Sequence, residues 1–182
     1  MFIQTETTPN PATLKFIPGR AVMPEGTAQF ADAEAAKRSP LAERLFGVPG
    51  VTAVFLGHDF ISVTKDDAQD WFQLKPSILG SIMEHYTSGR PVVLAPAGES
   101  ALAGEGDSET VAAIKELIET RVRPAVAQDG GDIVFEHFED GIVYLQMHGA
   151  CSGCPSSTAT LKSGIENMLR HYIPEVVEVR AL

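Results

Sequence analysis

The residues best able to do chemistry are two cysteines, Cys151 and Cys154, which are separated by two residues. They are the only cysteines among the 182 residues of the chain. A disulfide that closes so short a loop gains little entropy and is usually strained, so the pair is not expected to staple the fold. Thiolates bind soft metal ions and exchange disulfides. The pair therefore predicts a metal-binding or redox site.

The residues around the cysteines favour a compact loop that leads into a helix. Gly149 and Gly153 can adopt backbone angles that other residues resist, which lets both sulfurs face one point. Ser156 or Ser157 can cap the helix that follows. Because the N-terminal end of a helix carries partial positive charge, we expect this helix to lower the pKa of the thiols and to favour the thiolate form.

Two thiolates are too few for the sites that cysteines usually form, because zinc and the common iron–sulfur clusters normally take four protein ligands. His148 is the nearest further candidate, but we expect it to flank a strand end and not to bind metal. A two-fold axis through the site would present the cysteine pair twice. A symmetric dimer is therefore the simplest source of four thiolates, and a site at its seam suits the release of a cluster.

Three other interpretations of the cysteine pair stay open. A thiol–disulfide redox protein also uses CxxC at a helix start, although the expected element order lacks the βαβ opening of the thioredoxin fold. A structural zinc site lacks its usual ligand spacing. In the third interpretation the pair is incidental and the N-terminal domain carries the function. A Gly-x-Ser-x-Gly motif and a catalytic constellation are both missing from the sequence, so we do not expect an enzyme.

The chain is predicted to be α+β, with two small domains joined by a linker. Residues 96–107 are rich in Gly, Ala and acidic residues and contain one large apolar residue, Leu102. Such a segment buries too little apolar surface to order itself, so we expect a flexible linker. The predicted domains are residues 1–95, expected to contact clients or partners, and residues 108–182, which carry the cysteines.

The periodicity of apolar residues predicts the elements of both domains. In the first domain, Ser39-Pro40 opens a helix that runs to about Phe46, and a second helix spans residues 70–88 with Pro76 inside it. Strands are expected at residues 2–7, 13–18, 27–30, 51–56 and 60–64.

In the second domain the predicted order is αββαβ. Ser108 caps a helix that Pro124 is expected to kink, and the Asp-Gly-Gly-Asp of residues 129–132 ends it. The remaining elements are a hairpin at residues 133–138 and 142–147, a helix after the cysteines, and a strand at residues 176–179.

Composition and charge narrow the expected partners. The formal net charge is −10 and no basic stripe is present, so nucleic acid is not an expected partner. No apolar run approaches the ~18 residues that span a bilayer, so no membrane partner is expected. The first ten residues resemble neither a signal peptide nor a transit peptide, and the bacterial cytoplasm is the location expected from them. The other four histidines, at positions 58, 85, 137 and 171, are expected on the surface or on helix faces.

Several motifs outside the cysteine pair are distinctive. In the C-terminal region they are Arg123-Pro124, residues 129–132 (DGGD), residues 149–157 (GACSGCPSS), Thr160-Leu161-Lys162 and Gly164-Ile165-Glu166. In the first region they are residues 4–11 (QTETTPNP), Leu14-Lys15-Phe16, residues 39–42 (SPLA) and Leu74-Lys75-Pro76. The C-terminal region resembles the cluster-carrying domain of NifU and NifU-like (Nfu) proteins. The first region resembles the N-terminal domain of Nfu proteins of α-proteobacteria and mitochondria, so the resemblance covers nearly the whole chain.

The resemblance implies a homodimer, or an assembly of dimers, that binds a 4Fe–4S cluster through Cys151 and Cys154 of two subunits, with 2Fe–2S as the other cluster form. It implies that the cluster passes to apo iron–sulfur proteins, and that these and cluster-assembly factors are the partners. Full-length NifU has further cysteine-bearing regions that this sequence does not contain, so the resemblance favours a carrier over a scaffold for assembly from iron and sulfide.

Overall fold

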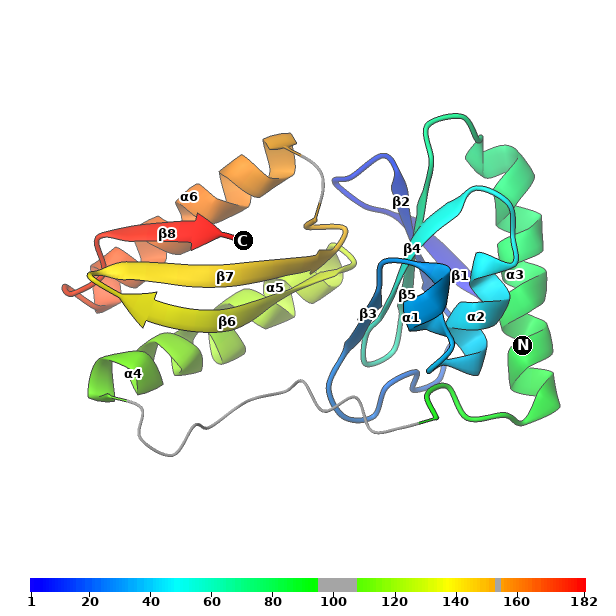
Figure 1. Cartoon of the computed structure of the whole chain (residues 1–182), viewed down its shortest axis with the longest axis horizontal. Helices are drawn as coiled ribbons and strands as arrows, with labels where there is room; N and C mark the ends of the chain where they lie inside the picture. Colours follow the sequence, from blue (N-terminus) through cyan, green and yellow to red (C-terminus); the bar gives the residue numbers. More distant parts are fainter. Residues whose placement is uncertain (95–107, 153–154) are drawn as a thin grey trace. The chain divides into compact units, whose positions relative to one another are not determined.

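The computed structural model describes residues 1–94, 108–152 and 155–182 of the chain, with residues 155–157 described by their backbone alone. The chain divides into two compact units, Met1–Ser100 and Ala101–Leu182 (Figure 1). Both units mix helices and strands, which confirms the predicted α+β class. The predicted linker, residues 96–107, lies outside the described residues, and its flexibility and the domain boundaries stay predictions.

The first unit is built on a five-stranded antiparallel sheet in the order β1-β2-β5-β4-β3. All five predicted strands are present, some of them shorter than expected. Apolar residues alternate along them, so that Phe16, Val54 and Ile61 point to the helix side and are fully buried there. The strand bounds are Gln4–Thr7 (β1), Thr13–Ile17 (β2), Ala28–Phe30 (β3), Val51–Leu56 (β4) and Ile61–Lys65 (β5).

Helices α2 (Pro40–Phe46) and α3 (Trp71–Ser88) cover one face of this sheet (Figure 1). The Ser39 hydroxyl caps α2 by accepting from the Ala42 amide at 3.0 Å, as predicted. Gly89 ends α3 with a left-handed φ of 68°. The short helix α1 (Ala33–Ala36) was not predicted from the sequence, because one turn carries no periodicity.

The second unit has the predicted order αββαβ. Its sheet has the order β6-β7-β8, in which β6 and β7 form the predicted hairpin and β8 lies parallel to β7. The turn of this hairpin needs positive φ at Asp140 and Gly141, with values of 51° and 78°. The bounds are Glu109–Leu117 (α4), Ile118–Val122 (the π-helical turn η1), Arg123–Gln128 (α5), Gly131–Glu139 (β6), Ile142–Gly149 (β7), Pro155–Tyr172 (α6) and Glu178–Ala181 (β8).

The helices of the second unit pack on one side of its sheet and enclose a separate core. Ile114 and Leu169, from α4 and α6, are fully buried against Ile133 and Leu145 of the sheet. Ser108 caps α4 by accepting from the Val111 amide at 3.3 Å, as predicted. In the part of the chain that the structure describes, no helix is both long and apolar enough to cross a membrane.

Two elements of the second unit differ from the prediction. The expected kink at Pro124 takes the form of the π-helical turn just before it, because a proline has no N–H to donate to the preceding turn. The last strand starts at Glu178, two residues later than predicted. The amides of Val177 and Glu178 first bond to the Gly141 carbonyl, at 2.7 and 3.3 Å, while Val176 packs in the core before the strand begins.

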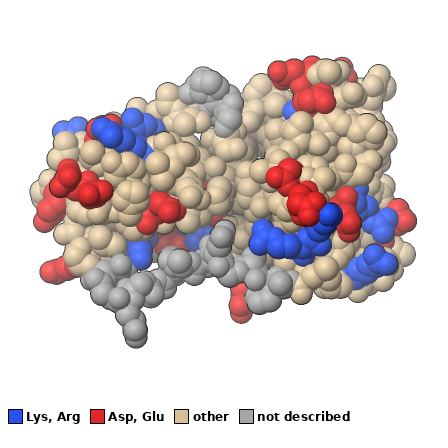
Figure 2. Space-filling view, in the orientation of Figure 1, with Lys and Arg blue, Asp and Glu red and all other residues tan. Residues whose placement is uncertain are grey.

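Surface charge is mixed in sign. On the face shown in Figure 2, Lys and Arg side chains occur in small groups near Asp and Glu side chains, and no continuous basic stripe crosses the described part of that face. One histidine departs from expectation: His85 lies on the buried side of α3, with 1% of its surface exposed.

Candidate metal centre

Cys151 lies in the loop between the end of β7 and the start of α6. Gly149, the last residue of β7, has a φ of 63°, which lets the chain leave the sheet sharply. The Ser152 amide donates to the Gly149 carbonyl at 3.1 Å and closes a turn around Cys151. The Thr158 hydroxyl donates to the Cys151 carbonyl at 3.0 Å and ties this turn to the first part of α6. The backbone of Cys151 is therefore fixed from both sides.

The side chain of Cys151 packs against the first residue of β6. Cys151 is 5% exposed, carries a free thiol and belongs to the core cluster of its unit. A Cβ added to Gly131 would lie 2.5 Å from the Cys151 Sγ, closer than real Cβ contacts allow. Gly131 is also the cross-strand partner of Gly149 in the hairpin. The absence of a side chain at Gly131 thus makes the space that the sulfur occupies.

An ion pair fixes the start of β6 beside the thiol. Arg123 donates from Nε and Nη2 to the two carboxylate oxygens of Asp132, each at 2.8 Å, and Asp132 also accepts from the Ile133 amide at 2.8 Å. Arg123 donates in addition to Glu119 at 2.7 Å. The Asp132 side chain is 5% exposed and that of Arg123 is 19% exposed. Such a bidentate pair defines geometry as well as charge, and here it anchors the residue next to Gly131.

The electrostatic setting of Cys151 corrects one prediction. Burial of the thiol, assisted by the negative charges of Asp129 and Asp132, raises the pKa of Cys151 to about 12. The sequence led us to expect a lowered thiol pKa from the N-terminal end of the helix. That expectation is wrong for Cys151, because desolvation disfavours a buried thiolate and two carboxylates repel it, and it stays a prediction for Cys154. Without metal, Cys151 is a neutral thiol at neutral pH.

The other residues predicted for the site have different outcomes. Cys154 and Gly153 lie outside the described residues, as do the side chains of Ser156 and Ser157, so the ligand pair and the predicted serine cap stay predictions. His148 stands opposite Asp132 in the hairpin, at the second-last position of β7, which is the predicted strand-end position. Within residues 1–94, 108–152 and 155–182, no three His, Cys, Asp or Glu side chains are grouped closely enough to hold a metal ion.

Sequence reasoning missed the parts that Gly131, Arg123, Asp132 and Thr158 play. The first three stand in the motifs Arg-Pro and Asp-Gly-Gly-Asp, which we had assigned to a helix kink and a helix end. A helix end usually needs one glycine, whereas this motif has two, Gly130 and Gly131. The second glycine was the one sign in the sequence that this position has a further role. The site as described offers one soft donor in a tightly packed cradle, a setting suited to a thiolate-ligated metal group once the thiol loses its proton.

Comparison with protein families divides the chain as the fold does. Residues 3–89 match the family described as "Scaffold protein Nfu/NifU N terminal". Residues 114–180 match the family described as "NifU-like domain". The two matches fall in the first and second units and leave the region between them unmatched.

Several curated proteins are similar along nearly the whole chain. "NifU-like protein 4, mitochondrial" of Arabidopsis thaliana is 55% identical over 97% of this chain and 64% of its own length. "NFU1 iron-sulfur cluster scaffold homolog, mitochondrial" of Homo sapiens is 54% identical over 97% of this chain and 70% of its own length. This chain thus spans about two thirds of the length of these relatives. The printed names describe NifU-like and scaffold proteins, and neither names an enzymatic activity.

One solved structure, the solution NMR structure of a NifU-like protein from Saccharomyces cerevisiae, is 27% identical, with a TM-score of 0.47. It covers 51% of this chain and 84% of its own.

The relatives overturn the predicted bacterial cytoplasmic location, because both are named as mitochondrial proteins. The prediction rested on the character of ten residues at the start of the sequence.

Proposed function

The chain belongs to the Nfu family of NifU-like proteins, and from this premise we propose that it carries an iron–sulfur cluster on Cys151 and Cys154 and passes it to apo iron–sulfur proteins. The observation that carries the proposal is the cradle of Cys151, a buried free thiol held against Gly131 in the NifU-like unit. The name of the human relative, an iron–sulfur cluster scaffold homologue, supports the same role.

We propose that the cluster is 4Fe–4S and that two copies of the chain share it. Each copy supplies two cysteines, and a two-fold axis through the loop after β7 would bring four thiolates together. A bridged cluster leaves when the dimer separates, so its release does not require the protein to unfold. A 2Fe–2S cluster would need the same four ligands and is the second form to test for.

The raised pKa of Cys151 makes loading of the proposed cluster dependent on pH. Iron must displace the proton of the thiol, so loading is coupled to loss of that proton. The proton competes with iron for the sulfur, and Asp129 and Asp132 add to the cost of the anionic form.

We propose that the first unit makes contacts to clients or partners and that residues 96–107 let the cluster site reach them. The composition of the linker supports this division of labour. Variants with a shortened linker test it. Cluster transfer to apo-proteins should slow in them while cluster binding stays unchanged, and equal transfer rates to every client would contradict the linker role.

Anaerobic reconstitution with iron and sulfide tests the carrier function. Mössbauer spectroscopy identifies the cluster type, and a loaded chain should then activate an apo 4Fe–4S enzyme when the two are mixed. The variant Cys151→Ala/Cys154→Ala should bind no cluster. The matched control His148→Ala removes the nearest alternative ligand and should keep the cluster. Loss of the cluster in His148→Ala alone would assign the ligands differently.

The same variants distinguish the carrier function from the alternative, thiol–disulfide exchange. An attacking cysteine needs a thiolate near neutral pH, and the raised pKa of the Cys151 thiol disfavours Cys151 in that role. A chain that takes up no iron and cycles between dithiol and disulfide would replace the carrier function with the redox function.

A further inference from the structure

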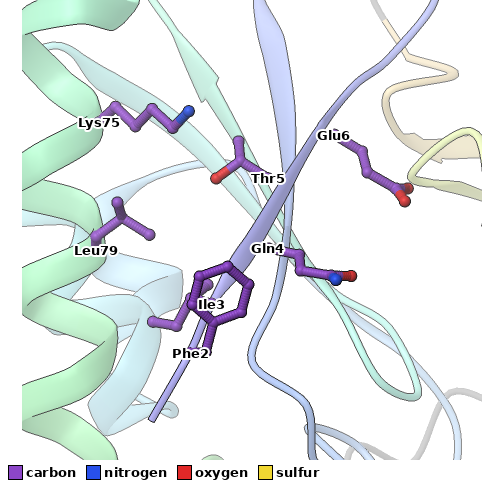
Figure 3. A pocket seen from close by; sticks show the side chains of 7 residues that line it. All are labelled: Phe2, Ile3, Gln4, Thr5, Glu6, Lys75 and Leu79. Carbon is purple, nitrogen blue, oxygen red and sulfur yellow. The ribbon is translucent and has the colours of Figure 1, made fainter.

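An open groove in the first unit lies between β1 and α3. It is lined by residues 2–6, of which residues 4–6 belong to β1, and by Lys75 and Leu79 from α3, with a volume of about 590 Å³ (Figure 3). All of these residues belong to the unit that matches the Nfu/NifU N-terminal family.

The strand side of the groove is an edge of the sheet, because β1 pairs with no second strand among the residues that the structure describes. β1 lies at the end of the strand order and pairs with β2 on one side. Three of its four residues are exposed. An edge strand presents backbone N–H and C=O groups that an extended segment of another chain can pair with. The groove therefore offers backbone pairing as well as side-chain contacts.

One end of the groove is apolar. Phe2 is 80% exposed and lies close to Ile3 and Leu79 (Figure 3). On α3, Met83 is 43% exposed and lies four residues from Leu79, on the same face of the helix. Large apolar side chains gathered on a surface indicate an interaction site, whereas single ones do not.

The other end of the groove carries a positive charge. The Lys75 side chain extends from α3 toward Thr5, whereas Glu6 points away from the helix (Figure 3). Glu6 pairs with Lys15 at 3.5 Å. In the part of the chain that the structure describes, Lys75 has no ion pair of its own. A carboxylate placed beside Thr5 would therefore meet an uncompensated ammonium group.

The register of the sheet sets the spacing that a ligand needs. Thr5 stands opposite Phe16, whose side chain lies in the core, so Thr5 and Ile3 face the helix layer. Residues two apart in a strand share a face. A strand added to β1 would thus place one side chain beside Ile3 and Leu79 and another, two residues away, near Lys75.

We propose that this groove binds an extended segment of a partner protein that carries an apolar side chain and a carboxylate two residues apart. The inference rests on the partner contacts proposed for the first unit and gives them a location and a chemistry. The groove belongs to the first unit and the cysteine loop to the second, so variants can change each one without changing residues of the other.

A defined peptide tests the groove on the full-length apo chain. The probe is a nine-residue Thr/Ser peptide, capped at both ends, with Ile at its fourth and Glu at its sixth position. It should shift the amide resonances of residues 3–7, 75 and 77–79 in a titration of the isotope-labelled chain. A second peptide with Lys in place of Glu should bind more weakly. Because an exposed ion pair is worth at most about 1 kcal/mol, the difference should be about fivefold.

Charge reversal gives the sharper result. Lys75→Glu should lower the affinity for the Glu peptide by about fivefold and raise the affinity for the Lys peptide by a similar factor. The control Lys37→Glu makes the same charge change on an exposed residue of the same unit and should alter neither affinity. Leu79→Asp should lower the affinity for both peptides.

Three outcomes would overturn the proposal. The first is no shift at these residues with peptide at millimolar concentration, and the second is binding that Lys75→Glu leaves unchanged. The third is a dimer of the apo chain that Leu79→Asp disrupts, seen by sedimentation, which would assign the groove to a second copy of the chain. Cluster reconstitution of Lys75→Glu should be normal, so failure here would leave the carrier proposal standing.

Discussion

The Sγ of Cys151 lies where a side chain at Gly131 would have to be, 2.5 Å from the position of its missing Cβ. The same Cβ would stand 2.9 Å from the His148 carbonyl oxygen and 3.0 Å from the Cys151 backbone nitrogen. Two of these three neighbours are backbone atoms, which cannot move aside without disturbing the hairpin. The position of the thiol therefore depends on a glycine 20 residues before it in the chain.

Gly131→Ala is expected to displace Cys151 and to destabilise the second unit by about 2 kcal/mol, in the range found for overpacked cores. Amide hydrogen exchange of Val143 and Leu145, both fully buried, measures this loss. The reconstituted variant should also hold less iron. Gly164→Ala is the matched control, since a Cβ there meets nothing within 4 Å, and a helical alanine should stabilise α6 by up to about 1 kcal/mol. Equal exchange rates in both variants would contradict the steric account.

Loss of the two hydrogen bonds from Arg123 to Asp132 should destabilise the second unit, because Asp132 would stay charged and buried without its partner. Arg123→Met is expected to destabilise the second unit by about 3 kcal/mol, as removal of one partner of a buried ion pair does. Amide hydrogen exchange of Val143 and Leu145 measures this loss of stability as well. Arg170→Met is the control, because Arg170 is 55% exposed and lies 3.9 Å from Glu166, so its loss should cost roughly 0 to 1 kcal/mol. An equal loss of stability in Arg123→Met and Arg170→Met would contradict this role of the buried ion pair.

The first unit should lose stability in mild acid through His85. Burial, with the nearby charges of Arg44 and Arg90, lowers the pKa of this histidine below its ordinary value of 6.5. Neither ring nitrogen has a hydrogen-bond partner among the described residues. The unfolded chain therefore binds a proton more readily than the folded one. The free energy of unfolding of the first unit should therefore be unaffected by His85 above pH 6.5, and it should fall as the pH drops from 6.5 toward the pKa of His85 in the folded chain.

Urea unfolding followed by the fluorescence of Trp71 isolates this effect, because Trp71 is the only tryptophan and lies on the same helix as His85. In His85→Leu the dependence on pH between 5 and 7 should flatten. A slope that His85→Leu leaves intact would show that other groups carry the acid sensitivity.

The sequence predicted the parts of the fold that local chemistry determines. Ser39 and Ser108 act as helix caps, the Glu-Asp-Gly turn joins β6 to β7, and Gly89 ends α3, all as their residue types require. The cysteine loop stands where a strand end meets a helix start. These features depend on a few neighbouring residues, so a single sequence reveals them.

The rest depends on residues that are distant in the chain. Nothing local indicates that Gly131 makes room for the Cys151 sulfur, or that Arg123 reaches Asp132. The pKa of the Cys151 thiol was predicted in the wrong direction for the same reason. A helix terminus can be read from the sequence, but burial and the charges of Asp129 and Asp132 act only once the hairpin brings them to Cys151. The helix α1 and the π-helical turn η1 were too short to leave a periodic pattern.

The central claim is that one cluster is held by the cysteines of two chains, and native mass spectrometry of mixed dimers tests it most directly. Wild-type chain and a mass-tagged Cys151→Ala/Cys154→Ala variant would be mixed, reconstituted anaerobically with iron and sulfide, and sorted by mass. The account predicts one cluster in dimers of two wild-type chains and none in mixed or variant dimers. A cluster retained by a wild-type monomer, or by mixed dimers at the wild-type level, would contradict it.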